Sequence, residues 1–163
     1  MKTFLASFMM KHSSQSLRSL RQILKEHGLR YSKPRATILR IFSEKHMHIS
    51  AEGLYLELKQ RGEALSLSTV YLNLGALRDA GLIREILDSN GEAVYDSNIT
   101  PHYHLICREC RTIVDIPIIA LAQTPLGQAL QQHTQAHANT WQVDEPDVIL
   151  HGLCPNCKNV KAA

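Results

Sequence analysis

The sequence predicts an α+β chain in two parts, an N-terminal winged helix-turn-helix half and a smaller α+β half that contains zinc. Three observations support this prediction: amphipathic helical segments that lead into a hairpin, a charge balance that changes sign near mid-chain, and two Cys-x-x-Cys pairs. With 163 residues, the chain can form one compact domain or two small ones. Its 44% hydrophobic and 20% charged residues exclude a fibrous repeat or wholesale disorder.

The first three predicted helices follow from apolar spacing and from their end signals. Residues 16–27 place leucine and isoleucine at helical spacing, and Gly28 suits the position just after a helix. Pro34 fits the first turn of the second helix, and Ser50 is a side-chain cap for the third.

The fourth predicted helix starts at Ser66 or Ser68 and ends at Gly81. Its apolar positions form one buried stripe, which consists of Leu67, Val70, Leu74 and Leu77. The remaining side chains are small, hydrogen-bonding or aromatic, with Leu72 as an apolar residue in an exposed place. Residues 82–87 then read as a strand, residues 88–91 as a turn and residues 92–96 as the returning strand.

Helices followed by a hairpin are typical of a winged helix-turn-helix, in which the last helix enters the major groove of DNA. Residues 1–84 hold 14 Lys/Arg and 6 Asp/Glu, whereas residues 85–163 hold 4 and 9. A basic half of this kind suits a polyanionic partner, so we expect double-stranded DNA. A generic small α+β domain with chance charge patterning is the alternative. The expected DNA-contacting residues are Ser68, Thr69, Tyr71, Asn73 and Arg78.

The second half reads as strands around one helix. Residues 104–107 and 112–116 are predicted strands, and later strands are expected at 141–143 and 148–150. Thr124 can cap a helix that begins at Pro125, with Leu126 and Leu130 on its inner side.

The four cysteines form two pairs with 43 residues between them: Cys107 with Cys110, and Cys154 with Cys157. Two short Cys-x-x-Cys turns can complete a tetrahedral structural Zn²⁺ site. Disulfides or a redox dithiol are the alternatives, but a thioredoxin-type site needs only one such pair, in a βαβ setting. Thiolates that must stay reduced imply a cytoplasmic location.

A second group of candidate metal ligands lies near the boundary of the halves. His102 and His104 are spaced i, i+2, so on a strand their imidazoles point to the same face. Asp96 precedes them, Asp115 follows on the next strand, and His48 comes from the helical half. Such an N/O ligand set suits Fe²⁺, Mn²⁺, Co²⁺ or Zn²⁺. Taken singly, each residue could instead be an ordinary polar group.

Four motifs resemble the ferric uptake regulator superfamily: residues 68–74 (STVYLNL), 102–110 (HYHLICREC), 113–115 (IVD) and 154–157 (CPNC). The match runs from about Leu17 to Lys158. The chain is most similar to the peroxide-stress regulator branch, because the iron-sensing branch usually has Glu at the position of Asp115 and a further His within the region of residues 144–147. Leu72 occupies a position where family members usually have a polar or basic residue.

The resemblance implies a dimeric, metal-activated transcriptional repressor with structural Zn²⁺ at the four cysteines. A regulatory Fe²⁺ or Mn²⁺ would bind His48, Asp96, His102, His104 and Asp115. Peroxide would oxidise His48 or His102, releasing the ion and then a palindromic operator. The implied organisation is an N-terminal tail (1–15), a winged-helix DNA-binding domain (16–96), a hinge (97–101) and a homodimerisation and metal-binding domain (102–163).

Two other functions stay open. One is a sensor of metal supply on the same scaffold, and the other, more remote, is a Cys-x-x-Cys oxidoreductase. We expect no enzyme, because the sequence has no Ser/His/Asp order, phosphate-binding loop or HExxH helix. We also expect no membrane partner and no small-molecule substrate except peroxide. Residues 1–10 are interpreted as tail rather than signal peptide, and no apolar run reaches the roughly 20 residues that span a bilayer.

Overall fold

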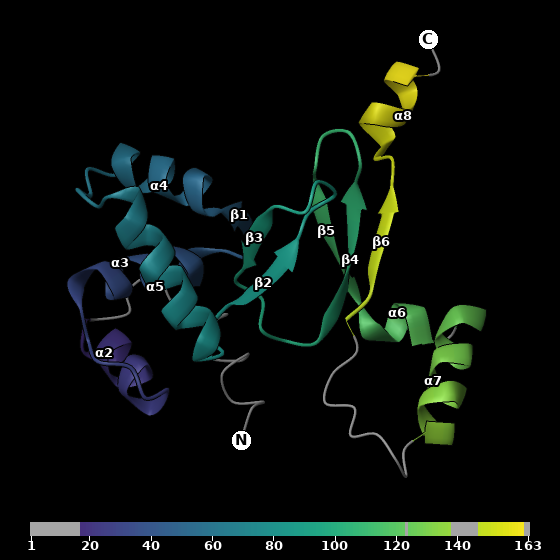
Figure 1. Ribbon diagram of the computed structural model, residues 1–163, viewed down its shortest axis with the longest axis horizontal. Coiled ribbons are helices and arrows are strands. Elements are labelled where there is room, and N and C mark those ends of the chain that lie inside the picture. Colours follow the sequence, from purple (N-terminus) through teal and green to yellow (C-terminus); the bar gives the residue numbers. More distant parts are fainter. Residues whose placement is uncertain (1–16, 123, 138–146, 162–163) are drawn as a thin grey trace. The chain divides into compact units, whose positions relative to one another are not determined.

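The computed structural model describes residues 17–122, 124–137 and 147–161, and divides the chain into two compact units between Thr100 and Pro101 (Figure 1). Each unit combines helices with a small sheet, which confirms the predicted α+β class. None of the helices in these described ranges is long and apolar enough to cross a membrane.

The first unit consists of helices that lead into a short sheet (Figure 1). Its elements are α2 (Leu17–Glu26), α3 (Lys33–Glu44), β1 (His48–Ser50), α4 (Ala51–Gln60), α5 (Leu67–Asp79), β2 (Arg84–Leu87) and β3 (Ala93–Asp96). The three strands pair antiparallel in the order β1-β3-β2. The hairpin of β2 and β3 follows directly on α5, as the winged-helix pattern requires.

Side-chain caps determine where these helices begin. The Ser50 hydroxyl accepts from the Gly53 amide at 3.1 Å, and the Ser66 hydroxyl accepts from the Thr69 amide at 3.2 Å. Both serines lie just before the first helical residue, so they satisfy amides that have no partner within the helix. The cap predicted at Ser50 is confirmed, and Ser66 rather than Ser68 begins α5.

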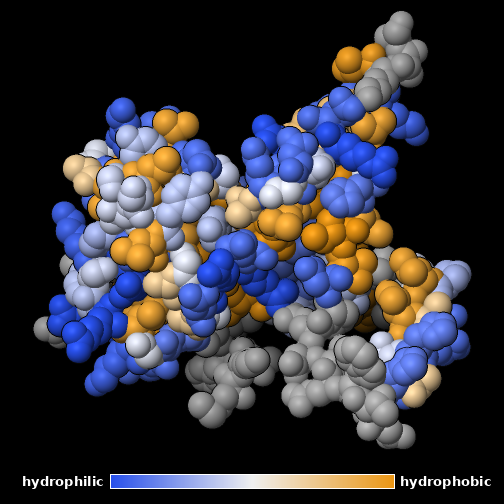
Figure 2. Space-filling view, in the orientation of Figure 1, coloured by the Kyte–Doolittle hydropathy of each residue, from blue (hydrophilic) through white to orange (hydrophobic). Residues whose placement is uncertain are grey.

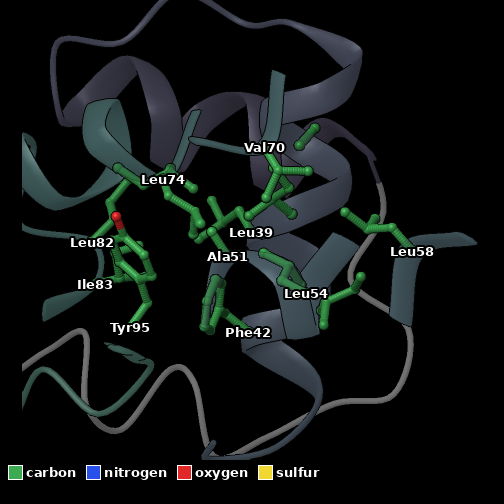
Figure 3. Close-up of a cluster of buried hydrophobic side chains, with 14 of the residues drawn as sticks. Leu39, Phe42, Ala51, Leu54, Leu58, Val70, Leu74, Leu82, Ile83 and Tyr95 are labelled. Carbon is green, nitrogen blue, oxygen red and sulfur yellow. The ribbon is translucent and has the colours of Figure 1, made fainter. Parts of the chain in front are cut away.

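The core of the first unit is built from the inner sides of its helices and closed by the hairpin. Phe42, Leu54 and Leu74 are almost completely buried, and Tyr95 of β3 packs into the same cluster (Figure 3). Burying a leucine or phenylalanine side chain contributes about 1.5–3 kcal/mol, so this cluster holds α5 and β3 on one rigid frame.

The second unit is a three-stranded sheet with helices at its ends. Its elements are β4 (His102–Cys107), β5 (Ile113–Pro117), α6 (Ile118–Ala122), α7 (Pro125–His137), β6 (Ile149–Gly152) and α8 (Pro155–Lys161). The central strand β4 pairs antiparallel with β5 and parallel with β6. The strand expected at residues 141–143 lies outside the described residues.

Among its described residues, this unit buries few apolar side chains. Helix α7 begins at Pro125 as predicted, with the Thr124 hydroxyl accepting from the Gly127 amide at 3.2 Å. However, Leu126 and Leu130 are 48% and 40% exposed, so the prediction that they lie inside is wrong for the single chain. Hydrophobic surface is visible over the β4–β6 sheet and over α6 and α7 (Figure 2).

Candidate metal centres and nucleic-acid interface

Helix α5 has a buried side and an exposed side. Val70, Leu74 and Leu77 are fully buried against the core, whereas Tyr71 and Leu72 are 45% and 72% exposed. Ser68 is also exposed, near the start of the helix. The exposed side therefore presents a hydroxyl, an aromatic ring and an aliphatic side chain, with no charge in its first two turns.

One residue expected on the exposed side lies inside. Asn73 is only 5% exposed, and its amide donates to the carbonyl of Thr69 at 2.8 Å within the same helix. The prediction that Asn73 faces DNA is therefore wrong, because position 73 lies between Val70 and Leu77 on the buried side. Thr69 is half-buried, and its hydroxyl lies 2.8 Å from that of Ser66 at the cap.

Tyr71 is held in place by a neighbour on α4. Its hydroxyl donates to the carboxylate of Glu52. This bond lowers the pKa of Glu52 and raises the pKa of Tyr71. Each group thus keeps the protonation state that the bond needs at neutral pH, and the tyrosine ring is oriented on the outer side of α5.

Arg78, the one predicted DNA-contacting cation, is already engaged. Its guanidinium donates to Glu85 of β2 at 2.5 Å and to Asp79 at 2.9 Å. The Glu85 and Asp79 carboxylates, in that order, raise the pKa of Arg78. The arrangement links the end of α5 to the hairpin and offsets the positive charge of Arg78.

Exposed cations gather instead around α2 and the loop that follows it. Arg21, Lys25, Arg30 and Lys33 are exposed, and Arg21 lies over the Tyr31 ring at 4.5 Å from its centroid. The charge balance of residues 1–84 predicts a basic half but does not locate this group of cations. The clustering of Arg and Lys within residues 21–33 is the sequence signal that locates it.

The four cysteines converge at the end of the second unit's sheet. Their sulfur atoms all lie within 4.8 Å of one another, and the Sγ atoms of Cys110 and Cys154 are 3.6 Å apart. A tetrahedral zinc site with Zn–S bonds of about 2.3 Å would place its sulfurs roughly 3.8 Å apart. None of the four described cysteines forms a disulfide. The donor set and its spacing fit Zn²⁺.

Hydrogen bonds shift the pKa values of the cysteines in this cluster in opposite directions. Backbone amides of Cys110 and then Cys154 point at the Cys107 sulfur and lower its pKa to about 6. The thiol of Cys157 lies against the sulfur of Cys154, which raises the pKa of Cys157 to about 12. One sulfur is thus ready as a thiolate at neutral pH, while another needs a cation to displace its proton.

In the first unit, strand register pairs His48 with Asp96. The Nε2 atom of His48 lies 3.6 Å from Oδ1 of Asp96, whose side chain is completely buried. Backbone contacts hold this corner, because the Met47 amide donates to the Ser97 hydroxyl at 2.9 Å and the Ser97 amide donates to the Met47 carbonyl at 3.2 Å.

In the second unit, β4 presents His102 and His104 on one side. Their Nε2 atoms are 2.9 Å apart, and the two side chains are 5% and 1% exposed. Two ligands at right angles about 2.0–2.1 Å from one ion would be roughly 2.9 Å apart. Asp115 is the register partner of His104, and its Oδ1 lies 3.6 Å from Nε2 of His102. The two imidazoles fit an N/O-liganded divalent cation, and the Asp115 carboxylate lies beside His102.

Residues 26–139 match the model of the ferric uptake regulator family, which is more than half of the chain. The chain belongs to this family. The matched region of this family member runs from the end of α2 to α7 and includes the candidate N/O ligands. The family consists of metal-responsive transcriptional repressors rather than enzymes.

Known relatives of this family member span nearly its whole length. The peroxide-responsive repressor PerR of Staphylococcus aureus is 30% identical over 145 residues, which cover 89% of this chain and 90% of the relative. The Vibrio cholerae ferric uptake regulator structure has a TM-score of 0.68 at 31% identity, covering 82% of this chain and 98% of that one. The Campylobacter jejuni peroxide stress regulator has a TM-score of 0.60 at 25% identity, covering 88% and 100%.

Proposed function

We propose that this chain is a peroxide-sensing, metal-dependent repressor that binds a palindromic DNA operator as a homodimer. The observation that carries the proposal is the ligand chemistry at the ends of the two units: His48 with Asp96 in one, and His102, His104 and Asp115 in the other. Only residues 97–101 connect these two sets. Similarity to the peroxide-responsive repressor of S. aureus favours this branch of the family.

The two ligand sets bind one regulatory Fe²⁺ or Mn²⁺ in this proposal. An ion that takes ligands from both units stabilises the conformers in which those ligands converge. That selection determines the spacing of the two α5 helices of a dimer on successive major-groove faces. A coupling free energy of about 1–3 kcal/mol would change operator affinity roughly 5- to 150-fold.

Structural Zn²⁺ at the four cysteines is the second part of the proposal. Metal binding of this kind contributes on the order of 10–16 kcal/mol to folding in small zinc domains. The second unit needs such a contribution, because among its described residues the buried apolar side chains are Tyr103, Ile106 and Cys107. Reduced thiolates are consistent with a cytoplasmic protein.

The exposed apolar side chains of the second unit support a homodimer. Ile119, Leu126 and Leu130 are 71%, 48% and 40% exposed on α6 and α7, and Val114 is 52% exposed on β5. Hydrophobic surface is visible over the sheet and over α6 and α7 of this unit (Figure 2), and large exposed apolar patches indicate protein–protein contacts. A second copy of the chain is the partner that a palindromic operator requires.

Peroxide sensing adds one chemical event at the regulatory site. Fe²⁺ held by these residues would supply the chemistry that activates H₂O₂. Overall, H₂O₂ would transfer one oxygen atom into a ring C–H bond of His48 or His102 and leave as one water, so the imidazole is oxidised by two electrons and the peroxide is reduced by two. The oxidised imidazole no longer matches the ligand set, so the conformer that binds DNA loses its selective stabilisation. With Mn²⁺ bound, we expect DNA binding that persists in peroxide.

A sensor of metal supply is the second candidate, favoured by the 31% identity to the V. cholerae ferric uptake regulator. It uses the same ligands and differs only in its signal. An oxidoreductase is a remote third candidate. All four sulfurs lie within 4.8 Å of one another, which suits one shared metal ion and gives the oxidoreductase no support.

The deciding experiment measures DNA retention by Fe²⁺-loaded and Mn²⁺-loaded protein before and after dilute peroxide, with mass spectrometry of the digested chain. We expect release of the Fe²⁺ form only, with one added oxygen on a peptide that contains His48 or His102. Oxygen on cysteine alone would contradict histidine oxidation. Retention by both forms would favour the sensor of metal supply.

Variants in the His48 segment test the ligand set. His48→Ala should abolish metal-dependent DNA retention while zinc stays near one per chain. His46→Ala is the matched control, because this exposed histidine lies two residues away and outside the β1–β3 pairing. Metal-dependent retention that survives in His48→Ala would refute the proposed switch.

A further inference from the structure

The exposed side of α5 has an aliphatic side chain at its centre. Leu72 is 72% exposed, whereas Leu74 and Leu77 of the same helix are fully buried. Leu72 therefore contributes little to the core of its own unit. Single exposed leucines are common on protein surfaces, so a second observation is needed before this one indicates a binding role.

Gly75 supplies that observation, one turn after Leu72 on the same side of the helix. A Cβ added at Gly75 would have no neighbour closer than Nη2 of Arg78 at 4.0 Å, so packing within the chain does not require a glycine. A glycine inside a helix costs about 1 kcal/mol relative to alanine. Bare backbone beside Leu72 suits the close approach of another molecule.

The lack of positive charge on this side of α5 limits which chemical groups of a partner it can recognise. From Leu67 to Leu77 the helix has no Lys or Arg, and Arg78 is bonded to Glu85 and Asp79. The commonest specific contact in the major groove, Arg or Lys to guanine O6 and N7, therefore cannot come from this stretch. Thymine presents a 5-methyl group there, which an aliphatic side chain recognises by apolar contact.

We propose that Leu72 determines sequence specificity by contacting the 5-methyl group of a thymine, with Gly75 leaving space for the base edge. The proposal rests on the DNA-binding function proposed above and assigns one base contact within it. Phosphate contacts that provide affinity come from elsewhere, such as the exposed cations of residues 21–33.

The test replaces thymine methyl groups one at a time. Full-length Mn²⁺-loaded protein selects duplexes from a random-sequence pool. Each thymine of a selected duplex is then replaced by uracil, which lacks only the methyl group. At one thymine of each half-site, we expect the change to weaken binding about fourfold, which corresponds to the ~0.8 kcal/mol of one buried methyl group. Leu72→Ala should bind both duplexes equally.

Two further variants make the result specific. Leu56→Ala removes a similarly exposed leucine, 55% accessible on α4. It should lose affinity at each uracil substitution by the same factor as the wild type. Gly75→Ala should weaken binding to the selected duplex without loss of folded protein, since the added methyl has space within the chain.

Two outcomes overturn the inference at different levels. If replacing thymine with uracil weakens binding by Leu72→Ala as much as binding by the wild type, the Leu72 contact is wrong while DNA binding stands. If the wild-type chain enriches no duplex from the pool, the proposed DNA-binding function fails, and the Leu72 contact fails with it.

Discussion

Gly53 and Gly75 both lie inside helices of the first unit, but their surroundings differ. A Cβ at Gly53 would lie 3.0 Å from Cγ1 of Ile49 and 3.4 Å from the Ser50 hydroxyl that caps α4. A Cβ at Gly75 would have open space on all sides except a distant Arg78 nitrogen. Space is therefore tight at position 53, where Ile49 would have to shift, and open at position 75.

This difference predicts opposite effects of the same substitution. Gly75→Ala should raise the free energy of unfolding by about 0.5–1 kcal/mol, because alanine is the better helix former. Gly53→Ala should lower it by about 1 kcal/mol or more, because crowding of Ile49 exceeds that gain. Urea unfolding at constant m-value measures both. Equal shifts in the two variants would contradict the argument.

At the cysteine cluster, proton positions predict how zinc binding depends on pH. Cys107, with its pKa lowered to about 6, is mostly ionised at neutral pH, but Cys157, with its pKa raised to about 12, is not. Zinc must displace at least the Cys157 proton, and below pH 6 the Cys107 proton as well. Acidification therefore opposes binding throughout this range.

We expect zinc affinity to fall at least tenfold per pH unit between pH 8 and pH 6, and more steeply below pH 6. Competition with a chromophoric chelator, corrected for the chelator's own protonation, measures this slope. Cys157→Ser provides the comparison, since it removes the group that holds the proton. An affinity independent of pH over this range would show that the sulfurs do not bind the metal.

The first residues of α4 and α7 could be predicted from the sequence, and the start of α5 to within two residues, because the capping side chains lie within three residues of the amides they satisfy. The Ser50 and Thr124 caps are local chemistry of this kind. The burial of Asn73 was harder to predict. This polar side chain lies on the buried side of α5 because its amide donates to the Thr69 carbonyl. Hydrophobic periodicity alone gives no sign of that bond.

The inner side of α7 was predicted wrongly for a different reason. Leu126 and Leu130 have the helical spacing of core residues, yet no described side chain of α7 is buried. Periodicity identifies which side of a helix avoids water, but it does not say whether the cover comes from the same chain. In the homodimer that we propose, the partner supplies it.

Charge placed on that side should therefore act on association. Leu126→Asp combined with Leu130→Asp should convert the dimer to monomer, because association would bury two unpaired carboxylates. Analytical ultracentrifugation measures the change, and circular dichroism checks that the monomer remains folded. Gln131→Asp and Gln132→Asp, at polar exposed positions of α7, serve as the matched control. A double leucine variant that stays dimeric would exclude α7 from the contact.

At the scale of the whole molecule, the chain joins two units through a short segment flanked by candidate metal ligands. Asp96 is the last residue of β3 and His102 is the first of β4. Near Asp96 a hydrogen bond holds this segment, because the Asp96 carboxylate accepts from the Asn98 amide at 2.7 Å. Strand spacing predicts that His102 and His104 share a face, whereas His48 and Asp96 were expected as ligands only from the family resemblance, because strand β1, which pairs them, was not predicted. The use of one ion by both sets is a hypothesis about two units and needs a test of the connection.

Lengthening the connection provides that test. Inserting Gly-Ser-Gly-Ser between Thr100 and Pro101, where the units divide, leaves both ligand sets and both sheets intact. If one ion takes ligands from both units, the effective concentration of one set at the other falls roughly with the −3/2 power of linker length. Regulatory-ion affinity should then fall at least two- to threefold, with a matching loss of metal-dependent DNA retention.

Zinc content and thiol protection should not change in this variant, because all four cysteines belong to the second unit. The same four residues added after Ala163 serve as the control for added length. Isothermal titration with Mn²⁺ and DNA retention in the same buffer give the two measurements. If the insertion leaves both unchanged, the ion is bound by one unit alone, and metal occupancy must act on DNA binding by some other route.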